Sequence, residues 1–131
     1  MDYINGGELF YHLQQVNRFN ENQVKFISIQ IILALGYLHK KLNVIYRDLK
    51  PENVILDEHG YLKLTDFGLS KQADHSDTFC GTPEYVSPEM LNGSGHDKNV
   101  DWWAMGILIY ELLAGIPPFY NKDVNVMYSN I

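Results

Sequence analysis

Four polar side chains that could handle a phosphate group lie within nineteen residues of one another. Asp48, Lys50 and Asn53 fall on one loop after a strand-like run, and Asp66 begins an Asp-Phe-Gly tripeptide thirteen residues beyond Asn53. A carboxylate beside an ammonium can orient a hydroxyl next to a phosphate. Carboxylate and amide oxygens are also hard ligands of the kind that Mg²⁺ accepts. Each motif alone is also explained as a turn, but together they favour a site for phosphate and metal.

A long amphipathic helix is predicted ahead of this loop. Asn20 can cap the helix, and Gln23 stands at the third helical position, as in a capping box. The apolar residues that recur on one face are Ile27, Ile31, Leu35 and Leu38. We expect this helix to pack on the core and to end near Lys40. A shorter helix is expected over residues 8–13, after the flexible pair Gly6-Gly7.

The chemical motifs follow short strand-like runs at residues 44–46, 54–56 and 61–64. These runs predict small hairpin elements that end in polar loops. Residues 69–98 are rich in Ser, Thr, Gly, Asp and Pro and show no sustained periodicity. We expect a long ordered loop with a brief helix at residues 88–91, and such loops in compact domains are usually functional.

Residues 100–114 are apolar nearly all round, which predicts a helix that is buried on most sides. Gly115 supplies its stop. Trp102 and Trp103 on this helix are interpreted as core residues rather than as a binding site. Residues 123–131 are typical of the first turns of another helix.

Composition limits the classes of function. A chain of 131 residues forms one domain or part of one, and its net charge of −6 argues against nonspecific binding to nucleic acid. The single cysteine, Cys80, fits a reducing compartment. The longest apolar stretch, 100–116, is interrupted by Asp101 and Glu111 and is short for a membrane span. We expect a cytoplasmic protein, with the nucleus also open, and no transmembrane segment.

The order and spacing of the two loops resemble the catalytic and metal-binding loops of protein kinases. The match continues through three further segments, Thr78-Phe79-Cys80-Gly81-Thr82-Pro83-Glu84-Tyr85, Ser87-Pro88-Glu89 and Asp101-Trp102-Trp103. Together these segments resemble the AGC group of serine/threonine kinases. Within that group, residues 2–14 are most similar to the serum- and glucocorticoid-regulated kinases, with protein kinase B close behind. Tyr46 replaces the more common His, and Ser87 replaces the usual Ala.

The resemblance implies an α+β, protein-kinase-like fold, with residues 1–131 forming a partial catalytic domain from the hinge to the start of helix αG. The large lobe would be mostly helical and incomplete. The small lobe would be absent, because no glycine-rich phosphate loop, strand lysine or partner glutamate is found. Asp101 resembles the buried helix carboxylate that braces the catalytic-loop backbone. We expect a domain truncated at both ends, inactive on its own.

ATP and Mg²⁺ are the cofactors that the resemblance implies. Asp48 would orient the substrate hydroxyl or accept its proton, and Lys50 would neutralise charge on the transferring phosphoryl group. Asn53 and Asp66 would hold the magnesium ions. The remaining nucleotide contacts would come from Met1, Asp2, Ile4, Glu8 and Glu52. For Glu8, a solvated residue in the first turn of a helix stays open as the alternative.

Regulation and substrate choice are also implied. Thr78 resembles an activating phosphosite whose phosphate would pair with Arg47 after modification by an upstream kinase. The positions that resemble substrate contacts are Glu8, Glu52, Thr82, Glu84 and Glu111. Carboxylates converging on one groove would favour protein substrates with Arg before the phosphoacceptor Ser or Thr. Scattered surface acids remain the alternative.

The leading prediction is therefore an ATP-dependent protein serine/threonine kinase. The main alternative is a noncatalytic kinase fragment or a pseudokinase-like scaffold, which the intact Asp48, Lys50, Asn53 and Asp66 disfavour. A small-molecule kinase is a weaker option, because residues 81–89 resemble a peptide-docking segment.

Overall fold

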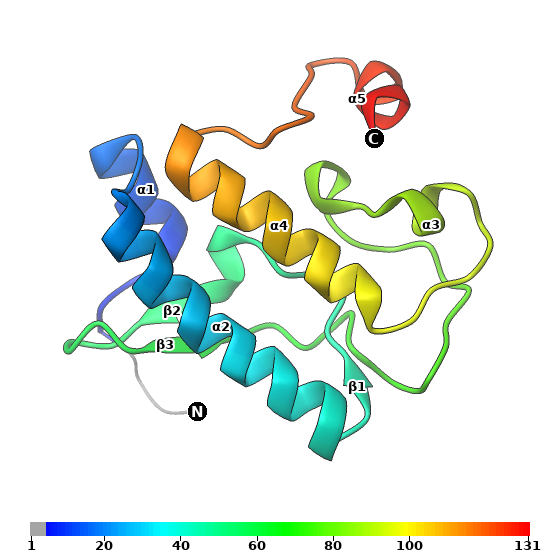
Figure 1. Cartoon of the computed structure of the whole chain (residues 1–131), viewed down its shortest axis with the longest axis horizontal. Helices are drawn as coiled ribbons and strands as arrows, with labels where there is room; N and C mark the ends of the chain where they lie inside the picture. Colours follow the sequence, from blue (N-terminus) through cyan, green and yellow to red (C-terminus); the bar gives the residue numbers. More distant parts are fainter. Residues whose placement is uncertain (1–4) are drawn as a thin grey trace.

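The computed structural model describes residues 5–131, and the elements that it forms run along the chain in a simple order (Figure 1). They are α1 (Leu9–Val16), α2 (Glu21–Lys41), β1 (Val44–Ile45), the 3₁₀ turn η1 (Pro51–Asn53), β2 (Val54–Leu56), β3 (Leu62–Leu64), β4 (Lys71–Gln72), the 3₁₀ turn η2 (Pro83–Tyr85), α3 (Pro88–Leu91), α4 (Asn99–Ala114) and α5 (Val124–Asn130).

Helix α2 begins at a capping box, as the sequence predicts. The Asn20 side chain accepts a hydrogen bond from the Gln23 N–H at 3.0 Å, and the Gln23 side chain accepts one from the Asn20 N–H at 3.0 Å. Two of the N–H groups that lack partners inside the helix are thereby satisfied. All four residues expected on the core face are buried: Ile27, Ile31, Leu35 and Leu38. The prediction of this helix is confirmed.

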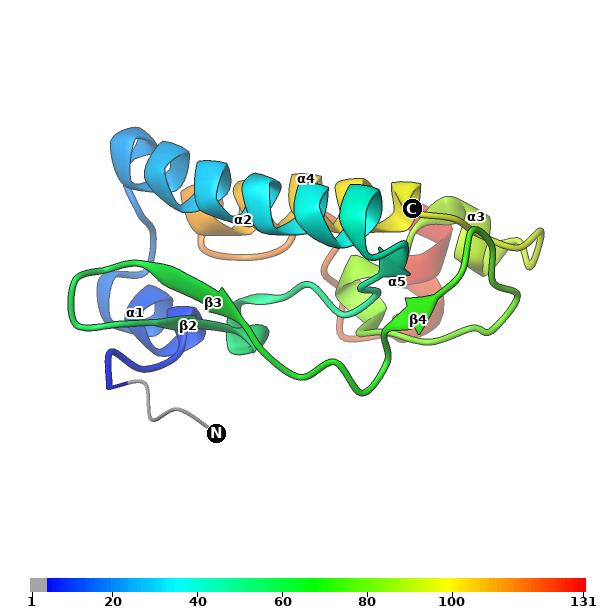
Figure 2. The same ribbon diagram turned by 90° about the horizontal axis from the view of Figure 1, so that it is seen from below.

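Helices α2 and α4 pack side by side and form one layer of the molecule (Figure 2). The β2–β3 hairpin and α1 lie on one side of this layer (Figure 2). Helices α3 and α5 lie on the side of α4 that faces away from α2 (Figure 1). Gly115 ends α4 in the left-handed region at φ 89°, where a side chain would be strained. No helix in residues 5–131 is long and apolar enough to cross a membrane.

One face of α4 differs from the expectation. Trp102 is 39% exposed and Tyr110 is 49% exposed, so the helix is not buried on most sides in this chain. Trp103 is half-buried, and its ring stacks on Phe119 with an interplanar angle of 7°. Of the two tryptophans, only Trp103 behaves as a core residue. Apolar composition all round a helix does not tell which side finds a neighbour.

The hairpin of β2 and β3 is antiparallel and pairs Val54 with Leu64, as expected from the strand-like runs. The second pairing was not expected. Strand β1 pairs with β4, which places Ile45 opposite Lys71 inside the segment predicted to be a loop. A strand of two residues has no periodicity that the sequence could display. The pairing connects the start of the 69–98 segment to the strand that leads into the loop of Asp48, Lys50 and Asn53.

Candidate active site

A buried carboxylate on α4 positions the backbone just before Asp48. Asp101 is 0% exposed, and its Oδ2 accepts the Tyr46 N–H at 2.9 Å while its Oδ1 accepts the Arg47 N–H at 2.7 Å. His39 on α2, also buried, places Nε2 2.7 Å from Asp101 Oδ2. The bracing role expected of Asp101 is confirmed, because a buried charge persists only when hydrogen bonds compensate its lost hydration.

His39 is a residue that sequence reasoning missed. It lies sixty-two positions before Asp101 and belongs to none of the motifs in the sequence. The edge of its ring meets Trp102, with centroids 5.2 Å apart. A histidine on the buried face of a helix is a weak signal by itself. The buried acid on another apolar helix was the clue that a polar partner had to exist.

Two residues of the site have left-handed backbone conformations. Arg47 has φ 67° and Asp66 has φ 52°, values that cost energy for residues other than glycine. At Arg47 the cost is offset by the Asp101 hydrogen bond to its N–H. At Asp66 the side chain accepts the N–H of Gly68 at 3.1 Å, which closes a tight turn. Both conformations turn the chain sharply beside a proposed functional carboxylate.

The three side chains of Asp48, Lys50 and Thr82 form a closed ring of polar contacts. Lys50 Nζ lies 3.1 Å from Asp48 Oδ2 and donates to Thr82 Oγ1 at 2.9 Å. The Thr82 hydroxyl in turn donates to Asp48 Oδ1 at 3.1 Å. Asp48 is 6% exposed, so these contacts replace most of its hydration. A carboxylate and an ammonium are thus held together next to a hydroxyl from the loop.

Backbone hydrogen bonds connect the loops that carry the two candidate metal ligands, Asn53 and Asp66. Asn53 Nδ2 donates to Asp48 Oδ2 at 2.8 Å, which leaves the amide oxygen of Asn53 available as a ligand. The Asn53 carbonyl accepts the Thr65 N–H at 2.9 Å, and Thr65 directly precedes Asp66. Asp66 is exposed and has an oxygen outside its turn. One amide oxygen and one carboxylate suit Mg²⁺, which keeps other positions for water and phosphate.

Tyr46 fastens the two loops to each other. Its hydroxyl donates to the carbonyl of Thr65, and its ring meets Phe67 edge to face at 5.3 Å. Burial raises the pKa of Tyr46, and the negative charges of Asp48, Asp66 and Asp101 raise it further. The phenol therefore stays protonated and acts as a donor. The residue that departs from the common kinase pattern is a structural link.

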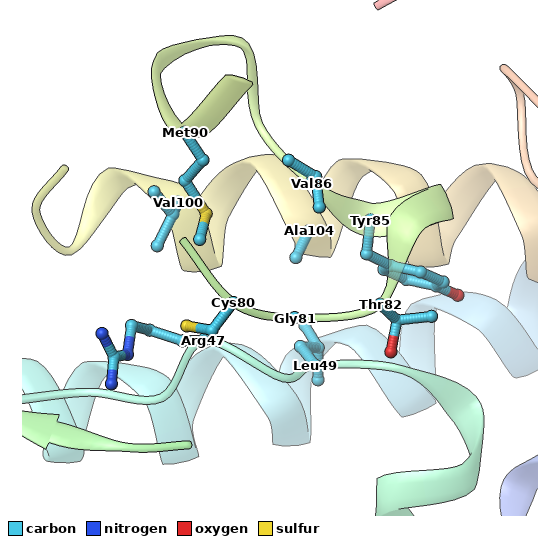
Figure 3. Close-up of a pocket in the computed structure, with 10 residues that line it drawn as sticks. All are labelled: Arg47, Leu49, Cys80, Gly81, Thr82, Tyr85, Val86, Met90, Val100 and Ala104. Atoms are coloured by element: carbon cyan, nitrogen blue, oxygen red, sulfur yellow. The ribbon is translucent and has the colours of Figure 1, made fainter. Parts of the chain in front are cut away.

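The loop that carries Thr82 packs closely against residues 47–49. Figure 3 shows Cys80, Gly81 and Thr82 beside Arg47 and Leu49, with Val100 and Ala104 of α4 above them in this view. Gly81 has φ 106°, and a Cβ at this position would lie 3.1 Å from the Arg47 carbonyl oxygen. A larger residue would be strained and would push the loop away. Gly81 thus allows Thr82 to reach Asp48.

A separate acidic pocket of about 310 Å³ opens between η1, η2 and α4. Its acids are Glu52, Glu84 and Glu111, and its other lining residues are Phe10, Pro51, Thr82, Tyr85, Pro117 and Tyr120. The Tyr85 hydroxyl donates to Glu111. Burial raises the pKa of Glu111; the Tyr85 hydrogen bond opposes this shift, and the Glu52 and Glu84 charges add to it.

The predicted site residues are thus only partly brought together. Four of the five residues assigned to substrate line the pocket, but Glu8 is not among them and lies exposed before α1. Thr78 is exposed, and Arg47 donates to Ser76 rather than to the Thr78 side chain. The expected nucleotide contacts Met1, Asp2 and Ile4 lie outside the described residues.

Comparison with known protein families gives a match that spans the chain. The model of the protein kinase domain matches residues 1–131. This chain belongs to the protein kinase family. The kinase-like fold with mixed helix and strand, expected from the sequence, is confirmed.

Several relatives narrow the group. The chain is 54% identical over 135 residues to human serine/threonine-protein kinase Sgk2, a match that covers 100% of this chain and 36% of that protein. It is 54% identical over 136 residues to the RAC family serine/threonine-protein kinase homolog of Dictyostelium discoideum, covering 100% of this chain and 30% of the relative. The resemblance to AGC kinases is confirmed. The chain spans about a third of the length of these relatives.

Proposed function

We propose that this protein kinase chain serves transfer of the ATP γ-phosphoryl group to serine or threonine hydroxyls of proteins. The observation that carries the proposal is the ring of Asp48, Lys50 and Thr82 beside Asn53. Positioning and charge stabilisation are most of what phosphoryl transfer requires from a protein. The location of the protein in the cytoplasm or nucleus, and the reading of 1–131 as part of a longer catalytic domain, stay predictions.

This geometry supports the chemistry that we assign to each residue. The substrate hydroxyl oxygen bonds to the γ-phosphorus as the bond to ADP breaks, and Asp48 orients the hydroxyl and receives its proton. Lys50, held 3.1 Å from Asp48, neutralises charge that develops on the phosphoryl oxygens. Asn53 and Asp66 would hold Mg²⁺, which when bound neutralises phosphate charge. Thr82 hydrogen-bonds to both Asp48 and Lys50 and so holds these two side chains in place.

The direct test is an assay of the complete gene product with radiolabelled ATP, Mg²⁺ and a serine peptide. Transfer of label to the peptide that requires Mg²⁺ supports the proposal. Binding of ATP without transfer, in protein that is phosphorylated on Thr78, would favour a pseudokinase scaffold instead. Transfer to small metabolites but to no peptide would favour the small-molecule alternative.

The pocket of Glu52, Glu84 and Glu111 supports a preference for basic peptides. Three carboxylates from three elements line one cavity, and the pKa of Glu111 is raised by burial and by its acidic neighbours. A guanidinium group would relieve this repulsion and can pair with a carboxylate through two hydrogen bonds. Tyr120 and Phe10 add aromatic faces, which also attract cations.

We therefore expect a peptide library to select Arg two to five residues before the phosphoacceptor. Glu52→Gln and Glu111→Gln should each weaken this selection by about tenfold, since a charge-assisted hydrogen bond contributes about 1.5–3 kcal/mol. Glu58→Gln is the matched control, because Glu58 is exposed and lies outside the pocket. An Arg preference that stays unchanged in both pocket variants would contradict the assignment.

Thr78 is the proposed activating phosphosite. Its exposed position suits access by an upstream kinase, and a phosphate there could take charge-assisted hydrogen bonds from Arg47. Thr78→Ala should lower activity in cells by at least about tenfold, because the new bonds of about 1.5–3 kcal/mol each are lost. Ser94→Ala, a change at another exposed hydroxyl, is the control. Full activity of Thr78→Ala would place the switch elsewhere.

A further inference from the structure

The middle of the 69–98 segment is bonded to the loop that precedes α4. The backbones of Ser76 and His96 exchange two hydrogen bonds of 2.8 Å, which form an isolated β-bridge. Both are backbone bonds, so they depend on where the two stretches of chain lie and not on either side chain. The contact between residues 74–77 and residues 95–98 is called the anchoring contact below.

Two side-chain contacts complete the anchoring contact. Gly95 has φ 77°, and a Cβ at this position would lie 2.1 Å from His75 Nε2, so the imidazole packs directly on the glycine. Lys98 Nζ lies 3.7 Å from Asp74 Oδ1, and the Asp74 side chain is 89% exposed. An ion pair exposed in this way adds little stability. The two backbone hydrogen bonds are therefore the strongest part of the anchoring contact.

His96 brings a titratable ring into this contact. The residue is 4% exposed, and its Nε2 has no hydrogen-bond partner in the part of the chain that the structure describes. A neutral imidazole can leave one nitrogen without a proton, so that this nitrogen needs no acceptor. A protonated imidazole has an N–H donor on both nitrogens and a full charge, and burying it without a partner is costly. The ring therefore fits its surroundings only in the neutral form.

The charges around the ring add to this effect. The charged or titratable groups that act on it are Arg47, His75, Asp77 and Glu89. Burial lowers the pKa of His96, and positive charge on Arg47 and His75 lowers it further. The two carboxylates oppose this shift but do not outweigh it. Lys71, whose Nζ lies 3.1 Å from Ser76 Oγ, adds positive charge next to the bridge.

The lowered pKa gives the direction of the pH effect. When the contact is open, His96 reaches water and binds a proton with its ordinary pKa of 6.5. When the contact is closed, the ring binds a proton only at lower pH. The closed form thus holds fewer protons, and acid favours the open form. The stability that the neutral ring allows is present above about pH 6.5 and is lost as the pH falls toward the lowered pKa.

We propose that His96 is a pH-sensitive switch, which keeps residues 74–78 in place while its ring is neutral and releases them when the ring is protonated. Opening breaks few contacts, because most of the loop around the ring is exposed: Asn92, Gly93, Ser94 and Asp97. Thr78 follows the bridge by two residues, so opening loosens the stretch that carries the proposed phosphosite. The switch itself does not depend on the proposed kinase function.

The first test compares the melting temperature of the kinase domain in wild-type and His96→Phe protein, each as the complete gene product. Phenylalanine keeps a ring of similar size and cannot be protonated. Between about pH 7.5 and about pH 5.5, we expect the wild type to lose about 2–4 °C more than His96→Phe. His59→Gln is the control, because the His59 side chain is 72% exposed, and it should lose as much as the wild type. Equal losses in the wild type and His96→Phe would overturn the proposal.

The second test follows the segment itself by amide hydrogen exchange, with labelling times adjusted for the intrinsic pH dependence of exchange. After this correction, residues 74–78 and 95–98 of the wild type should exchange at least about threefold faster at the lower pH. The core of α2 should stay unchanged, and His96→Phe should show no acceleration. The wild type alone decides this measurement, so it holds even if the variant does not fold. Protection of residues 74–78 that is the same at both pH values would overturn the switch.

Discussion

Replacing Asp48 with Asn is expected to lower kcat by about 10²–10⁴-fold, the contribution typical of a positioned acid or base. The amide keeps the size of the side chain and can still accept from Asn53, but it cannot take the proton of the substrate hydroxyl. The contact of 3.1 Å with Lys50 also loses its charge. We expect KM for ATP to change little, because Asp48 is assigned to the hydroxyl rather than to the nucleotide.

Steady-state kinetics of the complete gene product, with the melting temperature measured in parallel, check this expectation. The matched control is Asp74→Asn, since the Asp74 side chain is 89% exposed and its nearest cation, Lys98, is 3.7 Å away. The control should keep the wild-type rate. If Asp48→Asn keeps most of its rate, Asp48 is not the group that handles the hydroxyl proton. A rate loss matched by a large fall in melting temperature would point to a structural role instead.

Replacing Asp101 with Leu is expected to be the most destabilising single change at the site. It leaves the N–H groups of Tyr46 and Arg47, together with His39 Nε2, without their common acceptor. Removing one partner of a buried charged contact costs about 3–5 kcal/mol. This is a large part of the free energy of unfolding of a domain, which is roughly 5–15 kcal/mol. Urea denaturation of the complete gene product measures the loss.

Three further variants distinguish a hydrogen-bond network around Asp101 from simple packing. Asp101→Asn keeps one acceptor oxygen and should lose less stability than Asp101→Leu. His39→Leu removes a single donor and should also lose less. Asp74→Leu is the exposed control and should change the free energy of unfolding by less than about 0.5 kcal/mol. Asp101→Leu within about 1 kcal/mol of wild type would show that the bracing contacts contribute little.

Local patterns were enough to predict helix α2 and the end of helix α4. The capping pair of Asn20 and Gln23, the periodic face from Ile27 to Leu38 and the stop at Gly115 act within a few residues of one another, so the sequence displays them directly. The β1–β4 pairing involves Lys71 and Ile45, which are far apart in the chain, and short strands of this kind carry no local signal.

The exposed face of α4 shows a second limit of predicting structure from local sequence patterns. Apolar residues nearly all round the helix predicted that it is covered on most sides, yet Trp102 and Tyr110 are exposed. Hydrophobic character tells which residues can be buried, whereas burial itself depends on which elements lie alongside. The same holds for Glu8, whose match to a motif did not bring it to the acidic pocket.

The sequence by itself determined the kinase family and the candidate chemical groups, because residue types and spacings at Asp48, Asn53 and Asp66 are linear features. Only the tertiary structure decided how these groups are held: Thr82 closing the ring on Asp48, His39 and Asp101 meeting from two helices, and Ser76 seated between Arg47 and Lys71. Each of these contacts joins residues at least five positions apart, and most join residues twenty or more apart. Such contacts form only after the helices and loops have packed, so no local pattern reports them.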